Sequence, residues 1–256
     1  MFQFSLKKGY FYAVLILLPM LFLTACSQSQ RLSKDIGSTN GDTLERHNRD
    51  IFKFNASIDK LILKPIAVTY QKVTPDLVDT SISNFFGNLE DVGTAVNNLL
   101  QWKPGEALID VERVLFNSSI GLGGLFDVAT KIGLEKHDED FGQTLAVWGV
   151  DSGPYIMLPF LGPSTVRDFT SKFTVDSLLD PAKYSKASFS LFVLDKVDSR
   201  ADLISEEEAF KDFSDDQYSA LRDAWLQRRE FLIRDGKVDD DAQSDLIDAL
   251  EDLDDE

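Results

Sequence analysis

A stretch of twenty-six residues near the middle of the chain constrains the fold most, because it is almost free of charge. Phe141–Val166 carries one formal charge, on Asp151, together with four glycines and three prolines. So much apolar sequence should be buried in protein or lie against lipid, since soluble proteins rarely expose large apolar patches. The glycines and prolines exclude a membrane-spanning helix, which needs about twenty unbroken apolar residues.

Two short apolar runs within this stretch predict a β-hairpin near residues 142–160. They are rich in Val, Ile, Trp and Tyr and flank the loop Gly149–Gly153, an arrangement typical of two strands joined by a short connection. Such a hairpin can belong to an ordinary buried core. Alternatively, it can line an apolar passage with a glycine-hinged loop beside it, and composition does not separate the two.

The first 25 residues have the pattern of a secretory signal peptide. Two lysines, Lys7 and Lys8, precede an uncharged apolar run over Tyr10–Leu23. The segment Leu23-Thr24-Ala25-Cys26 follows, ends at the one cysteine of the chain, and matches the lipobox of bacterial lipoproteins. We therefore predict cleavage before Cys26 and attachment of lipid to its sulfur. A plain secretory signal with a stray cysteine is the alternative.

The residue after Cys26 indicates where such a lipoprotein would lie. Ser27 occupies the position at which an aspartate commonly retains lipoproteins in the inner membrane of Gram-negative bacteria. We therefore predict a lipid-anchored protein on the periplasmic face of the outer membrane. Without a second cysteine, the chain can form no internal disulfide and no thiolate metal cluster.

Composition divides the remaining chain into three parts. Residues 26–45 are polar and rich in Ser, Gln, Gly and Asn, which predicts a tether between the membrane and the folded part. Residues 46–235 have the size of one domain. Residues 236–256 form an acidic C-terminal tail.

Apolar spacing predicts that the domain is mainly α-helical. Over His47–Leu63 and Pro75–Trp102 the apolar residues recur at intervals of three and four. Lys64-Pro65 should end the first helix, and Gly87 and Gly93 should break the second into two. Three further helices are predicted over Glu106–Phe116, over Leu125–Ile132 and over the segment that contains Tyr218, Leu221, Trp225 and Leu232.

The tail differs from the domain in its charge. Asp235–Glu256 holds eleven acidic residues and one lysine, in a chain of formal net charge −17. Leu246, Leu250 and Leu253 occur there at helical spacing. A solvated tail is one interpretation, and an acidic arm that docks a basic partner is the other. So negative a chain is not expected to bind nucleic acid.

Residue patterns for catalysis or metal binding are scarce. The two histidines, His47 and His137, lie in polar surroundings near predicted segment ends. The sequence contains no Gly-x-Ser-x-Gly elbow, no His-Glu-x-x-His pair and no Walker loop. Asp151 is a candidate carboxylate in apolar surroundings, although a solvent-facing turn residue is the simpler interpretation. We predict no enzyme activity, no metal and no cofactor.

Several groups of residues follow the lipobox in a fixed order. They are Asn48-Arg49 through Asn55, Lys64–Val68, Ser83–Phe85 with Gly87–Leu89, Arg113–Asn117, Gly121–Ala129, Phe141–Leu145, Trp148–Val150 with Gly153–Tyr155, and Leu158–Phe160 through Arg167-Asp168. Together these groups cover roughly residues 46–235 and resemble the MlaA (VacJ) family of outer-membrane lipoproteins.

The resemblance implies a ring-like, mainly helical lipoprotein embedded in the inner leaflet of the outer membrane. Its ring would enclose an amphipathic channel through which mislocalised phospholipid leaves the outer leaflet for the periplasm. The implied partners are phospholipid, a trimeric porin and a soluble periplasmic carrier that feeds an inner-membrane ATP-driven transporter. Moving a lipid needs no covalent chemistry, which agrees with the missing catalytic groups.

The resemblance also places the family's glycine-rich channel loop on Gly149–Gly153, although the centre of that loop here is polar. A lipoprotein phospholipase and a structural envelope lipoprotein bound to porins are the alternative functions. The expected gating residues are Gly149, Asp151, Gly153, Pro154 and Tyr155, and the expected apolar lining is Leu145, Val147, Ile156, Leu158 and Phe160.

Overall fold

The computed structural model describes residues 42–207 and 215–237. The chain divides into two compact units, Met1–Thr43 and Leu44–Glu256, and only the second is described below. Cys26 and the three leucines of the acidic tail lie outside the described residues. The predictions made for them therefore stay predictions.

The described part of the second unit is mainly α-helical, as predicted, and its two strands are short. In chain order the elements are α2 (Glu45–Ile58), the π-helix η1 (Asp59–Leu63), α3 (Lys64–Val73), α4 (Asp76–Leu100), α5 (Pro104–Ser119), α6 (Val128–Lys131), α7 (Phe141–Val147), β1 (Tyr155–Leu158), β2 (Gly162–Thr165), α8 (Val166–Phe173), α9 (Val175–Leu179), the 3₁₀ helix η2 (Pro181–Tyr184), α10 (Ser188–Asp202) and α12 (Gln217–Ile233).

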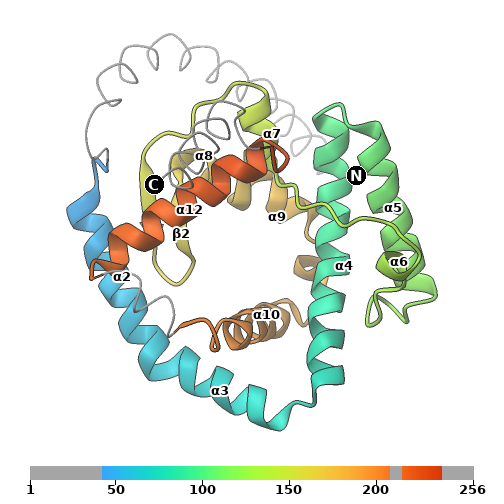
Figure 1. The fold of residues 1–256 in the computed structure, drawn as a ribbon, viewed down its shortest axis with the longest axis horizontal. Helices are drawn as coiled ribbons and strands as arrows, with labels where there is room; N and C mark the ends of the chain where they lie inside the picture. The colour runs from blue at the N-terminus through green and yellow to red at the C-terminus, as the bar shows by residue number, and fades with distance from the viewer. Residues whose placement is uncertain (1–41, 208–214, 238–256) are drawn as a thin grey trace, which may run out of the picture. The chain divides into compact units, whose positions relative to one another are not determined.

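Within this unit the elements follow one another around a closed circuit (Figure 1). The continuous path of α2, η1 and α3 leads to α4, α4 contacts α7, and α7 contacts α12. The circuit closes where α12 returns to α2, because Arg49 donates to the Asp216 carboxylate over 2.9 and 2.7 Å. The ring-like arrangement is thus confirmed for this unit, and α10 packs against both α3 and α4.

The prediction that Lys64-Pro65 ends the first helix is wrong. Helical backbone runs from Glu45 to Val73, and η1 ends two residues before Pro65. Proline lacks an N–H group, and its ring clashes with the carbonyl four residues earlier. In the π-helix η1 the backbone hydrogen bonds span five residues instead of the four of an α-helix. Lys64 N–H, for example, donates to the Asp59 carbonyl. We infer that this wider turn accommodates the ring.

The predicted break at Gly87 and Gly93 is also absent, since α4 is one uninterrupted helix of 25 residues. Glycine inside a helix costs about 1 kcal/mol relative to alanine. That cost is offset by packing of α4 along α5 and by its contacts with α7, α9 and α10. Tertiary contacts therefore override the local signal for a break.

The hairpin exists, but it lies further along the chain than predicted. Tyr155–Leu158 pairs antiparallel with Gly162–Thr165, with Tyr155 opposite Thr165. The run expected to form its first strand is instead the helix α7. Asp140 caps the start of α7 by accepting from Gln143 N–H at 2.8 Å, a signal just outside the apolar run.

An apolar cluster joins α2, β1 and α12. Its buried members are Tyr155, Met157 and Tyr218, and the partly buried residues packed against them are Ile51, Phe52, Leu221 and Trp225. The predicted stripe on the last helix is thus confirmed in part, because three of its four residues face this cluster.

Two asparagines of α2 hold β1 by its backbone. Asn48 donates to Tyr155 O at 3.1 Å and accepts from Met157 N–H at 2.9 Å. Asn55 makes the same pair of contacts with Leu158 O and Phe160 N–H, both at 2.9 Å. Seven helical residues rise about 10.5 Å, and three strand residues span about 10 Å. The distance between the two asparagines along α2 therefore matches the distance between the two carbonyl groups that they contact on β1. We call Asn48 and Asn55 the asparagine clamp.

Candidate functional site

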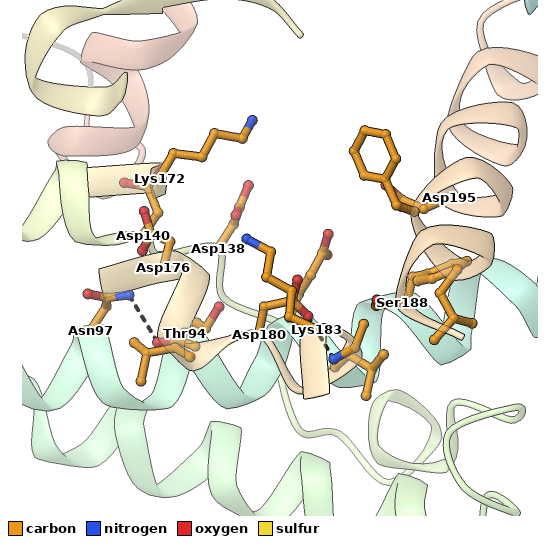
Figure 2. Close-up of a pocket in the computed structure, with 18 of the residues that line it drawn as sticks. Thr94, Asn97, Asp138, Asp140, Lys172, Asp176, Asp180, Lys183, Ser188 and Asp195 are labelled. Carbon is orange, nitrogen blue, oxygen red and sulfur yellow. Dashed lines mark hydrogen bonds between the residues drawn. The ribbon is translucent and has the colours of Figure 1, made fainter. Parts of the chain in front are cut away.

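A cavity of about 390 Å³ lies among α4, α9, η2 and α10 (Figure 2). The segment before α7, the end of α8 and the turn of the hairpin complete its wall. One part of the lining is apolar and consists of Phe86, Leu89, Leu161, Leu179, Leu191 and Phe192. Acyl chains are the kind of group that such a wall can cover.

The rest of the lining is dense in charge. Ten ionisable side chains face the same cavity, seven acidic and three basic: Glu90, Asp138, Glu139, Asp140, Asp176, Asp180 and Asp195, with Lys172, Lys183 and Lys196. The cavity is thus amphipathic, and it brings together cations and anions that lie far apart in the sequence.

Three of the seven carboxylates are neutralised by cations of the protein. Lys103 pairs with Glu139 at 3.0 Å, and Lys196 pairs with Asp195 at 2.8 Å. Asp140 receives two hydrogen bonds of 2.7 Å from Arg229 of α12.

Arg229 also holds a second carboxylate, that of Asp168, at 2.9 and 3.0 Å. Burial raises the pKa of Asp140, but the hydrogen bonds and charge of Arg229 outweigh it and hold that pKa below the usual value. A side chain at Gly142 would collide with both Asp168 and Arg229. This cluster fixes α12 against α7 and α8 and thereby fixes one edge of the cavity.

The other lysines of the cavity differ from Lys196. Among the described residues, Lys172 and Lys183 form no ion pair, and in Figure 2 both reach toward the open centre of the cavity. Burial lowers the pKa of Lys172, and the positive charges of Lys196 and Lys183 lower it further. The negative charges of Asp140 and Asp176 oppose this shift, so Lys172 lies among both cations and anions of the cavity.

The exposed surface is unusually apolar, and the helix interfaces are unusually polar. Arg113 and Asp91, which are 2% and 0% exposed, pair at 3.1 Å between α5 and α4. Large apolar side chains point outward instead, among them Leu61, Leu108, Leu115, Leu122, Phe189 and Trp102, of which Trp102 is 89% exposed. Exposed apolar surface of this extent marks contact with lipid or protein.

The predicted gating residues lie together, although they do not form a hairpin loop. Gly149 is the left-handed residue that ends α7, with φ 84°, and its N–H donates to Ala146 O. This is the Schellman arrangement, in which glycine is preferred because it has no Cβ. Asp151 is exposed and accepts from Gly153 N–H at 2.8 Å, the usual role of aspartate in a turn.

Pro154 and Tyr155 are fixed by a backbone hydrogen bond and by burial, respectively. Pro154 O accepts from Val166 N–H at 3.2 Å, and Tyr155 is 5% exposed within the apolar cluster. Ser152 O accepts from Arg167 N–H. The segment is therefore exposed at its centre and fixed at its end.

None of the five predicted lining residues borders the cavity described above. Leu145 is buried in α7, Val147 and Phe160 are exposed, and Ile156 and Leu158 are partly buried on β1. Leu161, in the turn between β1 and β2, is the residue of the apolar stretch that reaches the cavity.

Sequence reasoning missed the residues of α4, α8, α9, η2 and α10. A usable signal existed, since residues 172–196 contain four lysines and three aspartates, whereas acidic residues outnumber basic ones by 43 to 26 in the whole chain.

Two searches of the described residues bear on membranes and metals. Within residues 42–207 and 215–237, no helix has both the length and the hydropathy that crossing a membrane would require. In the same residues, no group of three His, Cys, Asp or Glu side chains is arranged to hold a metal ion.

Comparison with known proteins identifies the family. The model of the MlaA lipoprotein family matches residues 40–232. The chain belongs to the MlaA lipoprotein family. Every residue that borders the cavity lies within the matched range, so the cavity belongs to the part of the chain that defines the family.

Individual MlaA-like proteins agree with this assignment. An uncharacterized protein of Rickettsia bellii is 37% identical over 196 residues, which are 75% of this chain and 77% of that protein. The intermembrane phospholipid transport system lipoprotein MlaA of Escherichia coli is 32% identical over 225 residues, 84% of this chain and 88% of that protein.

A solved structure is also similar. It comes from work on the structural basis for maintenance of bacterial outer membrane lipid asymmetry. It superposes with a TM-score of 0.69 at 35% identity and covers 75% of this chain and 98% of that one. The mainly helical fold is therefore that of the MlaA family.

Proposed function

We propose that this protein is an outer-membrane lipoprotein that removes mislocalised phospholipid from the outer leaflet and passes it through the cavity toward the periplasm. The observation that carries the proposal is the amphipathic lining. A phospholipid has apolar tails and a charged headgroup, and the cavity offers an apolar wall and unpaired lysines within one space. The relatives' role in intermembrane phospholipid transport supports the same function.

The apolar exterior supports placement in one leaflet of the bilayer. Helices that expose residues such as Leu61, Leu115 and Trp102 bury apolar area only when lipid or a partner covers them. A lipid anchor on Cys26 would hold this surface at the membrane, since each buried CH₂ adds roughly 0.8 kcal/mol.

The partners belong to the same proposal. A lipid delivered to the periplasm needs an acceptor that shields its tails from water. A soluble periplasmic carrier that feeds an inner-membrane ATP-driven transporter fills that role, and a trimeric porin is the proposed neighbour in the membrane. A lipoprotein phospholipase would instead release lysophospholipid from purified protein and substrate.

The segment Gly149–Gly153 is the proposed gate. Its centre is exposed, and its glycines adopt φ values of 84° and 65°. An added Cβ at Gly149 would meet no atom within 4 Å. A substitution there therefore strains the left-handed backbone, although the new side chain would not collide with a neighbouring residue.

Blocking the cavity tests the proposal. Gly93 lies in the cavity wall on α4, where an added Cβ would meet only Leu179 Cβ, at 3.9 Å. Gly93→Phe should fill the passage, whereas Gly93→Ala should leave it open and slightly favour the helix. Cells that carry the blocked protein should accumulate outer-leaflet phospholipid and become sensitive to detergent and chelator.

Leu191→Trp, on α10, provides a second obstruction from another wall of the cavity. It separates a blocked passage from a defect specific to α4. Immunoblots of outer-membrane fractions should show normal amounts of each variant. Full barrier function in both Gly93→Phe and Leu191→Trp cells would contradict the proposed path.

A further inference from the structure

We propose that the cavity selects phospholipids whose headgroup carries a primary ammonium beside the phosphate, such as phosphatidylethanolamine, over phospholipids whose headgroup is only anionic. This inference rests on the proposed function, because it assumes that the headgroup enters the cavity. It adds a preference for headgroup charge, and it assigns that preference to particular side chains.

The first argument is the charge that remains after the protein's own ion pairs are formed. Once Glu139, Asp140 and Asp195 are paired with cations of the protein, four carboxylates and two lysines of the lining are left. Among the described residues none of these six forms an ion pair. They are Glu90, Asp138, Asp176 and Asp180, with Lys172 and Lys183.

The second argument is that the unpaired carboxylates reinforce one another. Burial raises the pKa of Glu90, and the negative charges of Asp138 and Asp195 raise it further; together they outweigh the positive charge of Lys136, which lowers it. Burial also raises the pKa of Asp176. A further cation beside Glu90 or Asp176 would therefore be favourable, because it would stabilise the charged form of the carboxylate.

The third argument is the chemistry of the two headgroup types. The phosphate of any phospholipid can be met by Lys172 and Lys183, which reach into the centre of the cavity (Figure 2). A headgroup with no positive charge then leaves the carboxylates uncompensated and adds its own negative charge to theirs. A headgroup with an ammonium group offers hydrogen-bond donors and a positive charge to Glu90 and Asp138.

Two pairs of substitutions separate the two halves of the site. Glu90→Gln with Asp138→Asn removes the two carboxylates assigned to the ammonium group, here called the acidic half, and preserves side-chain shape, while Asp176 and Asp180 stay in place. Lys172→Gln with Lys183→Gln removes the basic half. Asp50→Asn with Glu135→Gln is the matched control, because both residues are exposed and neither borders the cavity.

The experiment loads full-length, detergent-purified protein from micelles with equal amounts of phosphatidylethanolamine and phosphatidylglycerol of identical acyl chains. Bound lipid is counted by mass spectrometry after repurification. The wild type and the control should hold phosphatidylethanolamine in about tenfold excess, equivalent to ~1.4 kcal/mol. Loss of the acidic half should bring the ratio to about one, whereas loss of the basic half should reduce both lipids together.

Each other result has a definite meaning. A wild-type ratio equal to that of the micelles overturns the headgroup preference and leaves the proposed transport intact. A ratio that survives Glu90→Gln with Asp138→Asn overturns the assignment to these carboxylates. Wild-type protein that retains neither lipid overturns both the preference and the proposed function.

Discussion

Removing the asparagine clamp should loosen β1 from α2, and it should do so unequally at the two asparagines. Asn48 is 1% exposed, whereas Asn55 is partly exposed. Asn48→Ala takes away a hydrogen bond to Tyr155 O and one from Met157 N–H, both in a buried setting. Asn55→Ala takes away an equivalent pair that water can replace.

The magnitude follows from that difference in burial. A buried backbone group that loses its partner costs about 1–3 kcal/mol. We therefore expect Asn48→Ala to lower the free energy of unfolding by about 2–4 kcal/mol, and Asn55→Ala to lower it by about 1 kcal/mol. For a domain of this size, these losses correspond to roughly 5–15 °C and about 2–4 °C in Tm.

Thermal unfolding followed by circular dichroism in one detergent provides the measurement, with wild type, Asn48→Ala and Asn55→Ala in parallel. Near-UV signals should report the loss, because Tyr155 packs edge to face against both Tyr218, at a ring distance of 6.4 Å, and Trp225, at 6.0 Å. Equal shifts in Tm for the two variants would refute the reasoning, since burial would then not decide the cost.

Four further predictions concern charge, lipidation and the loop. Arg229→Met leaves the partly exposed Asp140 without its cation and takes one of two cations from the buried Asp168, which Arg167 still contacts at 3.1 Å. It should cost about 1–3 kcal/mol in urea unfolding; a loss near zero would contradict the proposed fixing of α12. Burial raises the pKa of Asp127, but its hydrogen bonds to α5 and α6 outweigh this and lower it to about 2. The ionised Asp127 carboxylate therefore contributes its full stabilisation above pH ~4, and this contribution is lost as the pH falls through about 2. Asp127→Asn should flatten the dependence of the free energy of unfolding on pH over that range. Cys26→Ala should leave the leader uncleaved or the protein mislocalised on fractionation, and full processing in the outer membrane would contradict the lipidation. Gly149→Val should slow lipid removal at normal protein abundance, while Gly149→Asn, which tolerates the left-handed backbone, should not; reduced abundance of the valine variant alone would make the glycine structural rather than a gate.

The sequence was sufficient for features that depend on neighbours along the chain. Intervals of three and four predicted α5 and α12, because apolar residues on one side of a helix recur with that period. On α12 that side faces the apolar cluster, whereas on α5 Leu108, Val111 and Leu115 are exposed. The order of short motifs also indicated the family, which the family comparison confirmed.

Where the sequence misled, contacts distant in the chain outweighed a local signal. Pro65 is accommodated by a π-helical turn rather than by a helix end. Gly93 remains inside one helix because α4 packs against α5, α7, α9, η2 and α10. The apolar run of α7 looked like a strand, since its helical character is set by Asp140 at one end and Gly149 at the other.

The candidate site is the part that only the tertiary structure decided. Its apolar wall and its charges come from α4, α8, α9, η2 and α10, segments in which single Lys and Asp residues carry no recognisable motif. Periodicity reports which face of a helix is apolar, but it does not report whether that face is buried or which other helix it meets. The amphipathic character of the cavity arises because ring closure brings Lys172 and Glu90 into one space, and no local pattern in the sequence encodes that meeting.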